Sequence, residues 1–205
     1  NGQATVVQYT DDPNLTGRYS AVLQSSKRVA VIVNQQTAPS GLSYMDSKPP
    51  FASYTGFESG SRQVTLPEVM YNWYGYYTEF YVQNVSDTAA NVTVAYYPGL
   101  AGATGVTEDA VVQPYSSHLF SQKSLASLGG ASGRFNGSAV ITSDQDIVAV
   151  VNEHNEGSQK LFSYIGFSAG SSELVAPSIL RGHYGWYTSM SIANPSLTAT
   201  ASVTI

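Results

Sequence analysis

The segment Gly166–Ser171 reads Gly-Phe-Ser-Ala-Gly-Ser and contains the pattern G-x-S-x-G. In α/β-hydrolases this pattern forms a strained turn that leads from a strand into a helix and presents a catalytic serine, here Ser168. A second copy of the segment, residues 56–61, has Glu58 in the place of that serine. The residues after the motif predict another strand, which ends at Pro177. We therefore expect a turn whose glycines adopt backbone angles forbidden to other residues, in a protein that is not an enzyme.

The histidines and acidic residues form no recognisable catalytic or metal-binding motif. His118, His154 and His183 each lack a paired partner, and the acidic clusters around Glu153 and Asp11 do not follow the spacing of a calcium-binding loop. The chain has no cysteine, which excludes thiolate ligands and cysteine nucleophiles. A pair of glycosidase carboxylates would lie far apart in the sequence and would leave no motif. We expect no metal and no cofactor.

Four Asn-x-Ser/Thr sequons begin at Asn14, Asn84, Asn91 and Asn136. Such sequons accept glycans in an exported protein, provided that the asparagine reaches solvent. In a chain rich in Asn, Ser and Thr they also arise by chance. In the second copy of the repeat the position of Asn84 is taken by Asn194, which precedes a proline and cannot be glycosylated. We regard all four as glycosylation candidates, and Asn84 as a turn residue first.

Aromatic residues cluster at 71–77 (Tyr-Asn-Trp-Tyr-Gly-Tyr-Tyr) and again at 181–187 (Arg-Gly-His-Tyr-Gly-Trp-Tyr). Exposed Tyr and Trp side chains stack on sugars or anchor protein interfaces. The alternative is packing in the core, which we expect of Tyr76 and Trp186. The interface or sugar-stacking candidates are Trp73, Tyr74, Tyr77, Tyr81, Tyr184 and Tyr187.

Composition and charge narrow the possible partners. Charged residues make up 11% of the 205 residues, and the net charge is −5. Because Lys and Arg form no cluster, we expect no nucleic-acid partner. No apolar run approaches the roughly 18–20 residues that cross a bilayer, so we expect no membrane span. The chain opens on Asn1 without a basic stretch, so we expect a removed signal peptide or a fragment.

An internal repeat organises the chain. Residues 54–84 align without gaps with residues 164–194, and residues 20–34 align with residues 138–152. Each copy has short runs rich in Val, Ile, Thr and Tyr, separated by Gly, Pro, Asn and Ser, which is typical of strands and turns. Evidence for helix is confined to residues 121–130, where we expect one or two turns.

We predict that the repeat forms two modules, residues 1–97 and 109–205, joined by a linker at 98–108. One segment shows which side chains should face the core, because apolar and polar residues alternate along 76–83. The side chains expected inside are Tyr76, Thr78, Phe80 and Val82. Those expected outside are Tyr77, Glu79, Tyr81 and Gln83.

The repeated segments Gly-Ser-Ala-Val-x-Thr-Ser-Asp, Ala-Val-Val-Asn and Tyr-x-Gly-Phe resemble immunoglobulin-like repeat modules of large prokaryotic cell-surface and secreted proteins. The resemblance covers nearly the whole chain. It implies an all-β fold of two tandem immunoglobulin-like antiparallel β-sandwich domains, with about seven strands each. It also implies a structural, adhesive or surface-layer role without catalytic residues.

The first strand admits two interpretations. Gln3–Thr10 resembles residues 109–116, which makes it the first strand of its own module. It also resembles residues 90–97 and the final segment 201–205. On the second interpretation it is a spare strand that fills a gap in a neighbouring subunit by pairing with an open sheet edge.

These observations favour an extracellular or cell-surface structural protein that assembles with copies of itself into a filament, surface layer or adhesive stalk. Strand exchange between subunits is one mechanism for that assembly. The alternative is a carbohydrate-binding accessory module of a larger secreted protein, with glycans as partners. A second alternative is a viral coat or fibre protein.

Overall fold

The computed structural model describes residues 17–36, 50–99, 105–155, 157–158 and 160–205. Within these residues most regular structure is antiparallel β-sheet, which confirms the expected all-β class. The strands are β1 (Ile32–Gln36), β2 (Phe51–Thr55), β3 (Ser61–Tyr71), β4 (Tyr76–Asn84), β5 (Ala90–Pro98), β6 (Val106–Val112), β7 (Ser117–Ser121), β8 (Phe135–Asn155), β9 (Lys160–Ile165), β10 (Arg181–His183) and β11 (Trp186–Tyr187).

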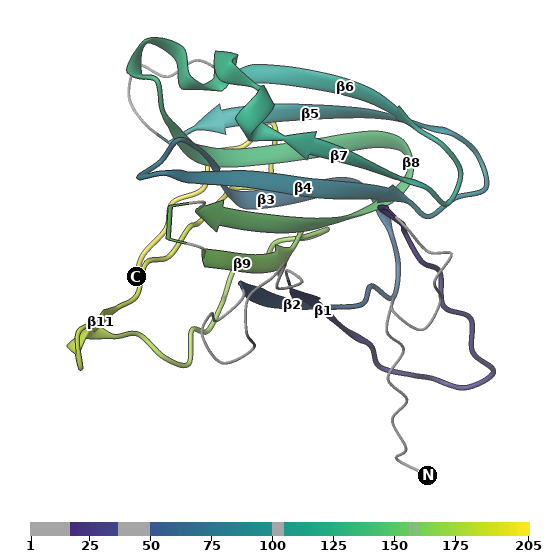
Figure 1. Cartoon of the computed structure of the whole chain (residues 1–205), viewed down its shortest axis with the longest axis horizontal. Helices are drawn as coiled ribbons and strands as arrows, with labels where there is room; N and C mark the ends of the chain where they lie inside the picture. Colours follow the sequence, from purple (N-terminus) through teal and green to yellow (C-terminus); the bar gives the residue numbers. More distant parts are fainter. Residues whose placement is uncertain (1–16, 37–49, 100–104, 156, 159) are drawn as a thin grey trace, which may run out of the picture.

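The long strand β8 organises the sheet because it pairs with four other strands. Its first half pairs with β3 on one side and with β5 on the other, so Ile141 lies opposite both Val64 and Val94. Its second half pairs with β4 and β9, so Val151 lies opposite both Phe80 and Tyr164. Strand β6 then pairs with β5, and β7 pairs with β4 (Figure 1). Strands β3, β4, β5 and β9 therefore all obtain backbone hydrogen bonds from β8.

Strand β8 bends over the sequence Ser-Asp-Gln-Asp, between Thr142 and Ile147. The pairing with β3 shifts at this point, because Gln63 lies opposite Thr142 whereas Ser61 lies opposite Ile147. An irregularity of this kind bends a strand and increases its local twist. As a result, one seven-stranded sheet curves around a single core and is close to a barrel in shape.

The core is formed by apolar side chains from β3 to β8 together with Leu128. Strand β4 follows the predicted alternation: Thr78, Phe80 and Val82 are buried, and their neighbours are partly exposed. The Thr78 hydroxyl accepts a hydrogen bond from the Met70 amide at 2.8 Å, which satisfies this polar group inside the core. Tyr76, also expected inside, is half-buried and stacks on Phe162.

The predicted boundary between two modules is wrong. The described ends of the expected linker lie in or next to two paired strands: Pro98 ends β5, β6 begins at Val106, and these strands pair from Ala90 opposite Val112 to Tyr96 opposite Val106. Strands assigned to both predicted modules therefore share one sheet and one core. The structure places a complete unit at residues 61–167, which starts in the middle of the first predicted module. A periodic sequence reveals the length of its repeat but does not show where the folded unit begins.

The expected helical turns at residues 121–130 are 3₁₀ turns, Gln122–Ser124 and Ala126–Ser132. They bring the buried Gln122 to one end of the core, where its amide donates to the Tyr96 hydroxyl at 2.8 Å. That hydroxyl donates in turn to Glu108 at 2.6 Å. Burial, reinforced by Glu108, raises the pKa of Tyr96, so the phenol remains protonated.

Candidate functional site

The turn that contains Ser168 is not a nucleophile elbow. Ser168 is exposed, and residues 169–180 contain neither a helix nor the strand that was expected to end at Pro177. The Phe167 backbone pairs with Thr65 through hydrogen bonds of 2.8 and 2.9 Å. The expected reason for the glycines is wrong, because neither Gly166 nor Gly170 has a positive φ angle. Gly166 is instead needed for close approach, since a Cβ atom there would lie 2.4 Å from Val64 Cγ1.

The structure separates the glycosylation candidates. Asn84 is fully buried, and its amide donates to the carbonyl oxygens of Thr88 at 2.7 Å and Val112 at 3.1 Å. Because a glycan acceptor must reach solvent, Asn84 is no longer a glycosylation candidate. Asn91 is exposed, although its amide donates to Asp144 at 2.6 Å, and this bond lowers the pKa of Asp144. Asn136 is partly exposed, and Asn14 lies outside the described residues.

The aromatic candidates of the first copy surround the turn between β3 and β4. Trp73 is partly exposed, with the Arg134 guanidinium 5.8 Å from its ring centroid, and its ring packs against Tyr74 at 5.0 Å. Tyr77 packs edge-on against Tyr71, with Lys123 5.8 Å from its ring. Tyr81 lies apart from this group, on the outer face of β4, where the Arg18 guanidinium covers it at 5.9 Å. Of the four candidates only Tyr74 is largely exposed.

The same turn recurs in the second copy with the same backbone. Tyr74 and Gly75 have φ angles of 51° and 80°, and Tyr184 and Gly185 have φ angles of 48° and 81°. A left-handed conformation costs a residue with a side chain about 1–2 kcal/mol. Tyr184 and Tyr187 are exposed as predicted, whereas Trp186, expected inside, is exposed. The local sequence thus specifies this turn even where no sheet covers it.

A buried acid lies between β3, β8 and β9. Glu153 is 8% exposed, and burial, together with the negative charge of Glu68, raises its pKa to about 8. The Tyr164 hydroxyl donates to the Glu68 carbonyl oxygen, and burial raises the pKa of this phenol. Among the described residues, no group of three His, Cys, Asp or Glu side chains could hold a metal ion. Glu153 is therefore a buried carboxyl whose protonation affects the stability of the unit.

In the sequence Glu153 stood out only as part of an acidic cluster without the spacing of a calcium-binding loop. Two signals pointed to its burial. It continues the inward-facing series Ile147, Ala149 and Val151 at every second position, and the first copy carries the uncharged Gln35 at the equivalent place.

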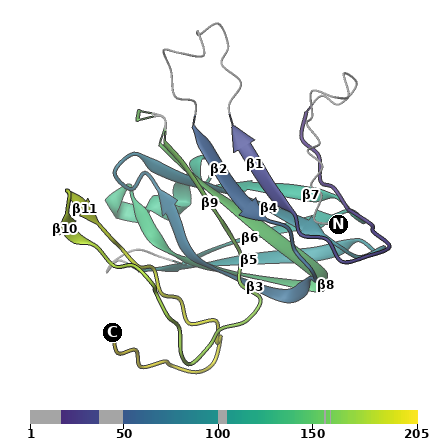
Figure 2. The same ribbon diagram turned by 90° about the horizontal axis from the view of Figure 1, so that it is seen from below.

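The residues on either side of the complete unit are parts of further units. Residues 17–36 and 50–56, the N-terminal half-unit, repeat β8 and β9. Residues 168–205, the C-terminal half-unit, repeat β3, β4 and the start of β5. Figure 2 shows β1 and β2 apart from β10 and β11.

The N-terminal half-unit reproduces the pairing of its counterpart. In the β1–β2 hairpin Ile32 lies opposite Thr55 and Asn34 lies opposite Ser53. The equivalent residues of β8 and β9 pair in the same register, with Val150 opposite Ile165 and Asn152 opposite Ser163. The repeat is therefore present in the structure as well as in the sequence.

The C-terminal half-unit reproduces local contacts of its counterpart without forming its sheet. The Leu180 amide donates to the Thr188 hydroxyl at 3.0 Å, as the Met70 amide does to Thr78. Asn194 donates to the carbonyl oxygen of Ala199 at 2.6 Å, as Asn84 does to Thr88. Apart from the short pair β10–β11, residues 168–205 contain no assigned strand. Within the described part of the chain the turns are therefore in place, whereas the ladders to a β8-type strand are not.

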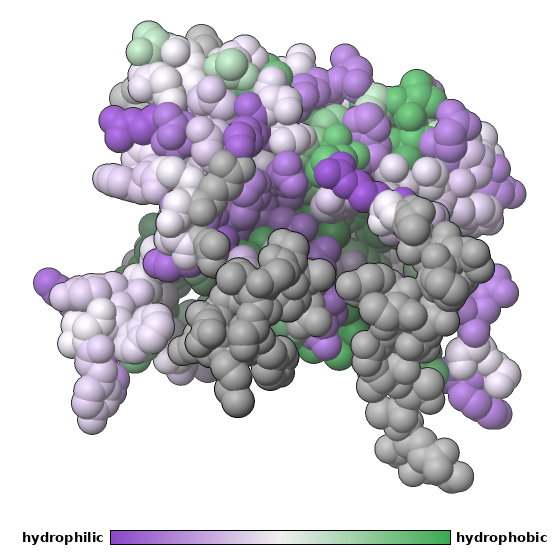
Figure 3. Space-filling view, in the orientation of Figure 1, coloured by the Kyte–Doolittle hydropathy of each residue, from purple (hydrophilic) through white to green (hydrophobic). Residues whose placement is uncertain are grey.

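Both half-units expose apolar side chains whose counterparts are buried in the complete unit. Leu23 is 67% exposed and Leu174 is 83% exposed, whereas Ile141 and Val64, at the equivalent positions, are 0% and 2% exposed. The remaining exposed residues with buried counterparts are Val22, Val29, Ile32, Val175, Ile179, Met190, Ile192, Val203 and Ile205. Fully burying one such side chain contributes about 1.5–3 kcal/mol to the free energy of folding or association. Figure 3 shows hydrophobic residues below the main body of the molecule, partly behind grey atoms.

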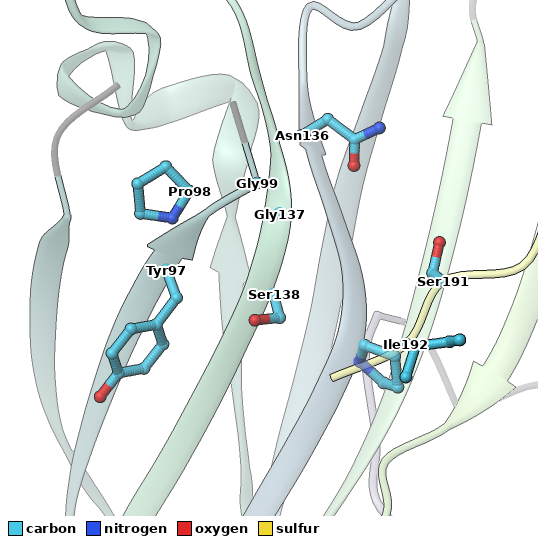
Figure 4. A pocket seen from close by; sticks show the side chains of 9 residues that line it. Tyr97, Pro98, Gly99, Asn136, Gly137, Ser138, Ser191 and Ile192 are labelled. Carbon is cyan, nitrogen blue, oxygen red and sulfur yellow. The ribbon is translucent and has the colours of Figure 1, made fainter. Parts of the chain in front are cut away.

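An open groove of about 290 Å³ separates the complete unit from the C-terminal half-unit. It is lined on one side by residues 97–99 and 136–138, and on the other by Ser191 and Ile192 (Figure 4). The lining also includes Pro67, ranges from glycine to Tyr97 and contains no charged group. The groove therefore has the character of an incompletely packed joint between units.

No protein-family model matches the chain, and no curated protein matches it. Among solved structures, the crystal structure of Thermotoga maritima 1070 is similar, with a TM-score of 0.44 and 16% sequence identity over 55% of this chain and 98% of that chain. No helix in the described part of the chain is long and apolar enough to cross a membrane. Function is therefore inferred from the geometry of the chain itself.

Proposed function

We propose that this chain is a non-catalytic structural protein that assembles with copies of itself outside the cell. Its building block is a repeated immunoglobulin-like β-sandwich unit, and the assembly is a filament, a surface layer or an adhesive stalk. The proposal of an extracellular location draws on the exposed sequon at Asn91, because such sequons accept glycans in exported proteins.

One observation carries the proposal: apolar residues that are buried in the complete unit have exposed counterparts in both half-units. Large exposed apolar surfaces are uncommon on soluble proteins and usually mark an interaction site. Extended segments also present unpaired backbone groups, which bind other chains by adding strands. Both features favour association over catalysis.

The test is the assembly state of the purified chain over a wide range of concentration. We expect light scattering after size exclusion to detect species larger than a monomer, and negative-stain imaging to show ordered polymers. Leu174→Asp places a charge on the exposed surface and should reduce assembly, whereas Ser168→Ala serves as a matched control on the same exposed segment. A chain that stays monomeric at every concentration contradicts the proposal.

Carbohydrate binding is a second candidate, favoured by Tyr74 and Tyr184. Both tyrosines are exposed at the tip of the same turn, and both have a left-handed backbone. Strained backbone that is retained at an exposed aromatic residue suggests a contact role. A monomer that is retarded on a polysaccharide column, and that loses retardation in the double variant Tyr74→Ala/Tyr184→Ala, would favour this function.

A further inference from the structure

We infer that the turn between β3 and β4, together with Arg134, is a binding site for acidic saccharides, in which a sugar carboxylate pairs with the Arg134 guanidinium. The inference rests on the second candidate function, carbohydrate binding, and deepens it. It names the chemical class of the sugar and the side chain that selects it. Self-assembly is not needed for this site, because all of its residues lie within the complete unit.

The Arg134 guanidinium is positioned by an aromatic ring and keeps its hydrogen-bond donors. It lies over Trp73, 5.8 Å from the ring centroid. A cation–π contact consumes none of the five N–H donors of an arginine. Arg134 is exposed, and among the described residues these donors have no hydrogen-bond or ion-pair partner. Such a guanidinium can bind a carboxylate through two parallel N–H···O bonds.

Local hydrogen bonds fix the backbone from which Arg134 extends. The Arg134 amide donates to the Ser132 hydroxyl at 3.2 Å. Gly133, between these two residues, has a φ angle of 65° and ends the second 3₁₀ turn. The Asn72 amide donates to the Gly133 carbonyl oxygen at 3.2 Å, which ties this segment to the aromatic turn. Groups that are fixed before binding lose less conformational entropy when the ligand binds.

The aromatic side chains of the turn provide the surface for a sugar ring. Trp73 is partly exposed and packs edge-on against Tyr74, which is 75% exposed. The Asn155 amide donates to the Tyr74 carbonyl oxygen at 3.1 Å and braces the turn against β8. Rigid aromatic side chains supply contact area at a low cost in conformational entropy. The turn therefore combines a fixed aromatic surface with a cation that can accept a charged partner.

The charges around the turn favour an acidic sugar over a neutral one. The whole chain has a net charge of −5, yet two cations lie beside these aromatic side chains. Lys123 is the second, 5.8 Å from the ring centroid of Tyr77. A sugar carboxylate supplies the opposite charge at this place. Single-stranded nucleic acid also binds aromatic and cationic side chains, but it needs a positive groove along its backbone, and Lys and Arg form no cluster in this sequence.

The test uses two probes that differ in charge but share the same sugar rings. A short oligogalacturonate carries a carboxylate on each sugar, and its methyl ester carries none. Calorimetry measures the affinity of the full chain for each probe at one low protein concentration. We expect the acidic probe to bind about tenfold more tightly than the ester, as one charge-assisted hydrogen bond would give. The difference should shrink as salt is added, because salt screens exposed charges.

Variants of the chain test the assignment to Arg134. Arg134→Gln should lower the affinity for the acidic probe about tenfold and leave the affinity for the ester unchanged. Arg134→Lys keeps the charge without the planar fork and should restore only part of the loss. Arg62→Gln removes the same charge from an exposed position on β3 and is the matched control, which should follow wild type. Trp73→Ala should weaken the binding of both probes. Circular dichroism checks that each variant folds.

The outcomes separate this inference from carbohydrate binding in general. Equal affinity for the two probes, or an acidic probe that is unaffected by Arg134→Gln, overturns the inference and leaves binding of neutral sugars by the aromatic turn intact. Binding of neither probe also overturns it, while the polysaccharide column tests the broader function separately. A single-stranded oligonucleotide that binds more tightly than the acidic probe, with the same dependence on Arg134, would assign the site to a different polyanion.

Discussion

The carbonyl oxygen of Val31 accepts a hydrogen bond from the Gly56 amide at 3.0 Å, just beyond the β1–β2 hairpin. The equivalent residues of the second copy, Ala149 and Gly166, form the same bond at 2.8 Å. The loops inside the two hairpins differ in length, yet the register on both sides of them is the same. The side chains and the closing glycine, rather than the loop, therefore set the pairing of this hairpin.

Equivalent positions in the two copies should respond differently to the same truncation. Ile141→Ala removes a fully buried side chain and should destabilise the complete unit by about 2–5 kcal/mol. Leu23→Ala, at the equivalent exposed position, should change unfolding by less than about 0.5 kcal/mol at low protein concentration but should weaken self-association. Urea unfolding and sedimentation measure the two effects. Equal losses of stability would show that Leu23 already packs within its own chain.

Glu153 should make the complete unit less stable as the pH rises. The pKa of this carboxyl is raised from 4.5 to about 8, so the folded state keeps a proton that the unfolded state has released. Its favourable contribution is complete below pH 4.5 and is lost between about pH 4.5 and 8, with a slope of up to about 1.4 kcal/mol per pH unit. Glu153→Gln should remove this slope and give the more stable protein at pH 8.

Urea midpoints of wild type and Glu153→Gln at pH 4, 6 and 8 measure this dependence. Glu58→Gln, at an exposed carboxyl just before the unit begins, is the control and should follow wild type. Parallel curves for wild type and Glu153→Gln would mean that Glu153 ionises normally in the folded state.

Tyr96→Phe should destabilise the unit by about 1–3 kcal/mol, because it leaves Gln122 and Glu108 without their shared partner. Tyr97→Phe is a suitable control, because the Tyr97 side chain points away from the core. This change should alter the free energy of unfolding by less than about 0.5 kcal/mol. Thermal or urea unfolding provides the measurement. Equal stabilities of the two variants would show that the buried network contributes nothing net.

The Gly-Phe-Ser-Ala-Gly segment should be sensitive at its glycine and insensitive at its serine. Gly166→Ala forces a Cβ atom against Val64 and should cost about 1–3 kcal/mol. Ser168→Ala changes an exposed side chain and should leave folding and any esterase turnover unchanged. Loss of such turnover in Ser168→Ala, with the fold intact, would restore the nucleophile hypothesis.

The alternation along β4 could be read from the sequence because every second side chain of a strand faces the same way. Thr78, Phe80 and Val82 are buried for that local reason. Trp186 is equivalent to Tyr76 and was expected inside by the same rule, but it is exposed. Its orientation depends on a neighbouring strand that the described structure does not place there, and alternation alone cannot supply one.

Asn84 likewise has one feature that is local in the sequence and one that depends on a contact with a distant strand. Its sequon is a local pattern, and its role in a turn was expected from the proline that follows Asn194. Its burial depends on β6, because the Val112 carbonyl oxygen lies 3.1 Å from its amide, across the sheet. A contact between strands that are distant in the sequence leaves no mark on the sequon itself.

The sequence by itself determined the repeat, the β class, the turn around Tyr74 and Tyr184 and the register of the β8–β9 type hairpin. These features depend on residues that are close together in the chain. Only the tertiary structure decided that the folded unit spans residues 61–167, with β8 bent at Ser143–Asp146. That choice depends on which strands share β8, and backbone pairing between distant segments has no local signature.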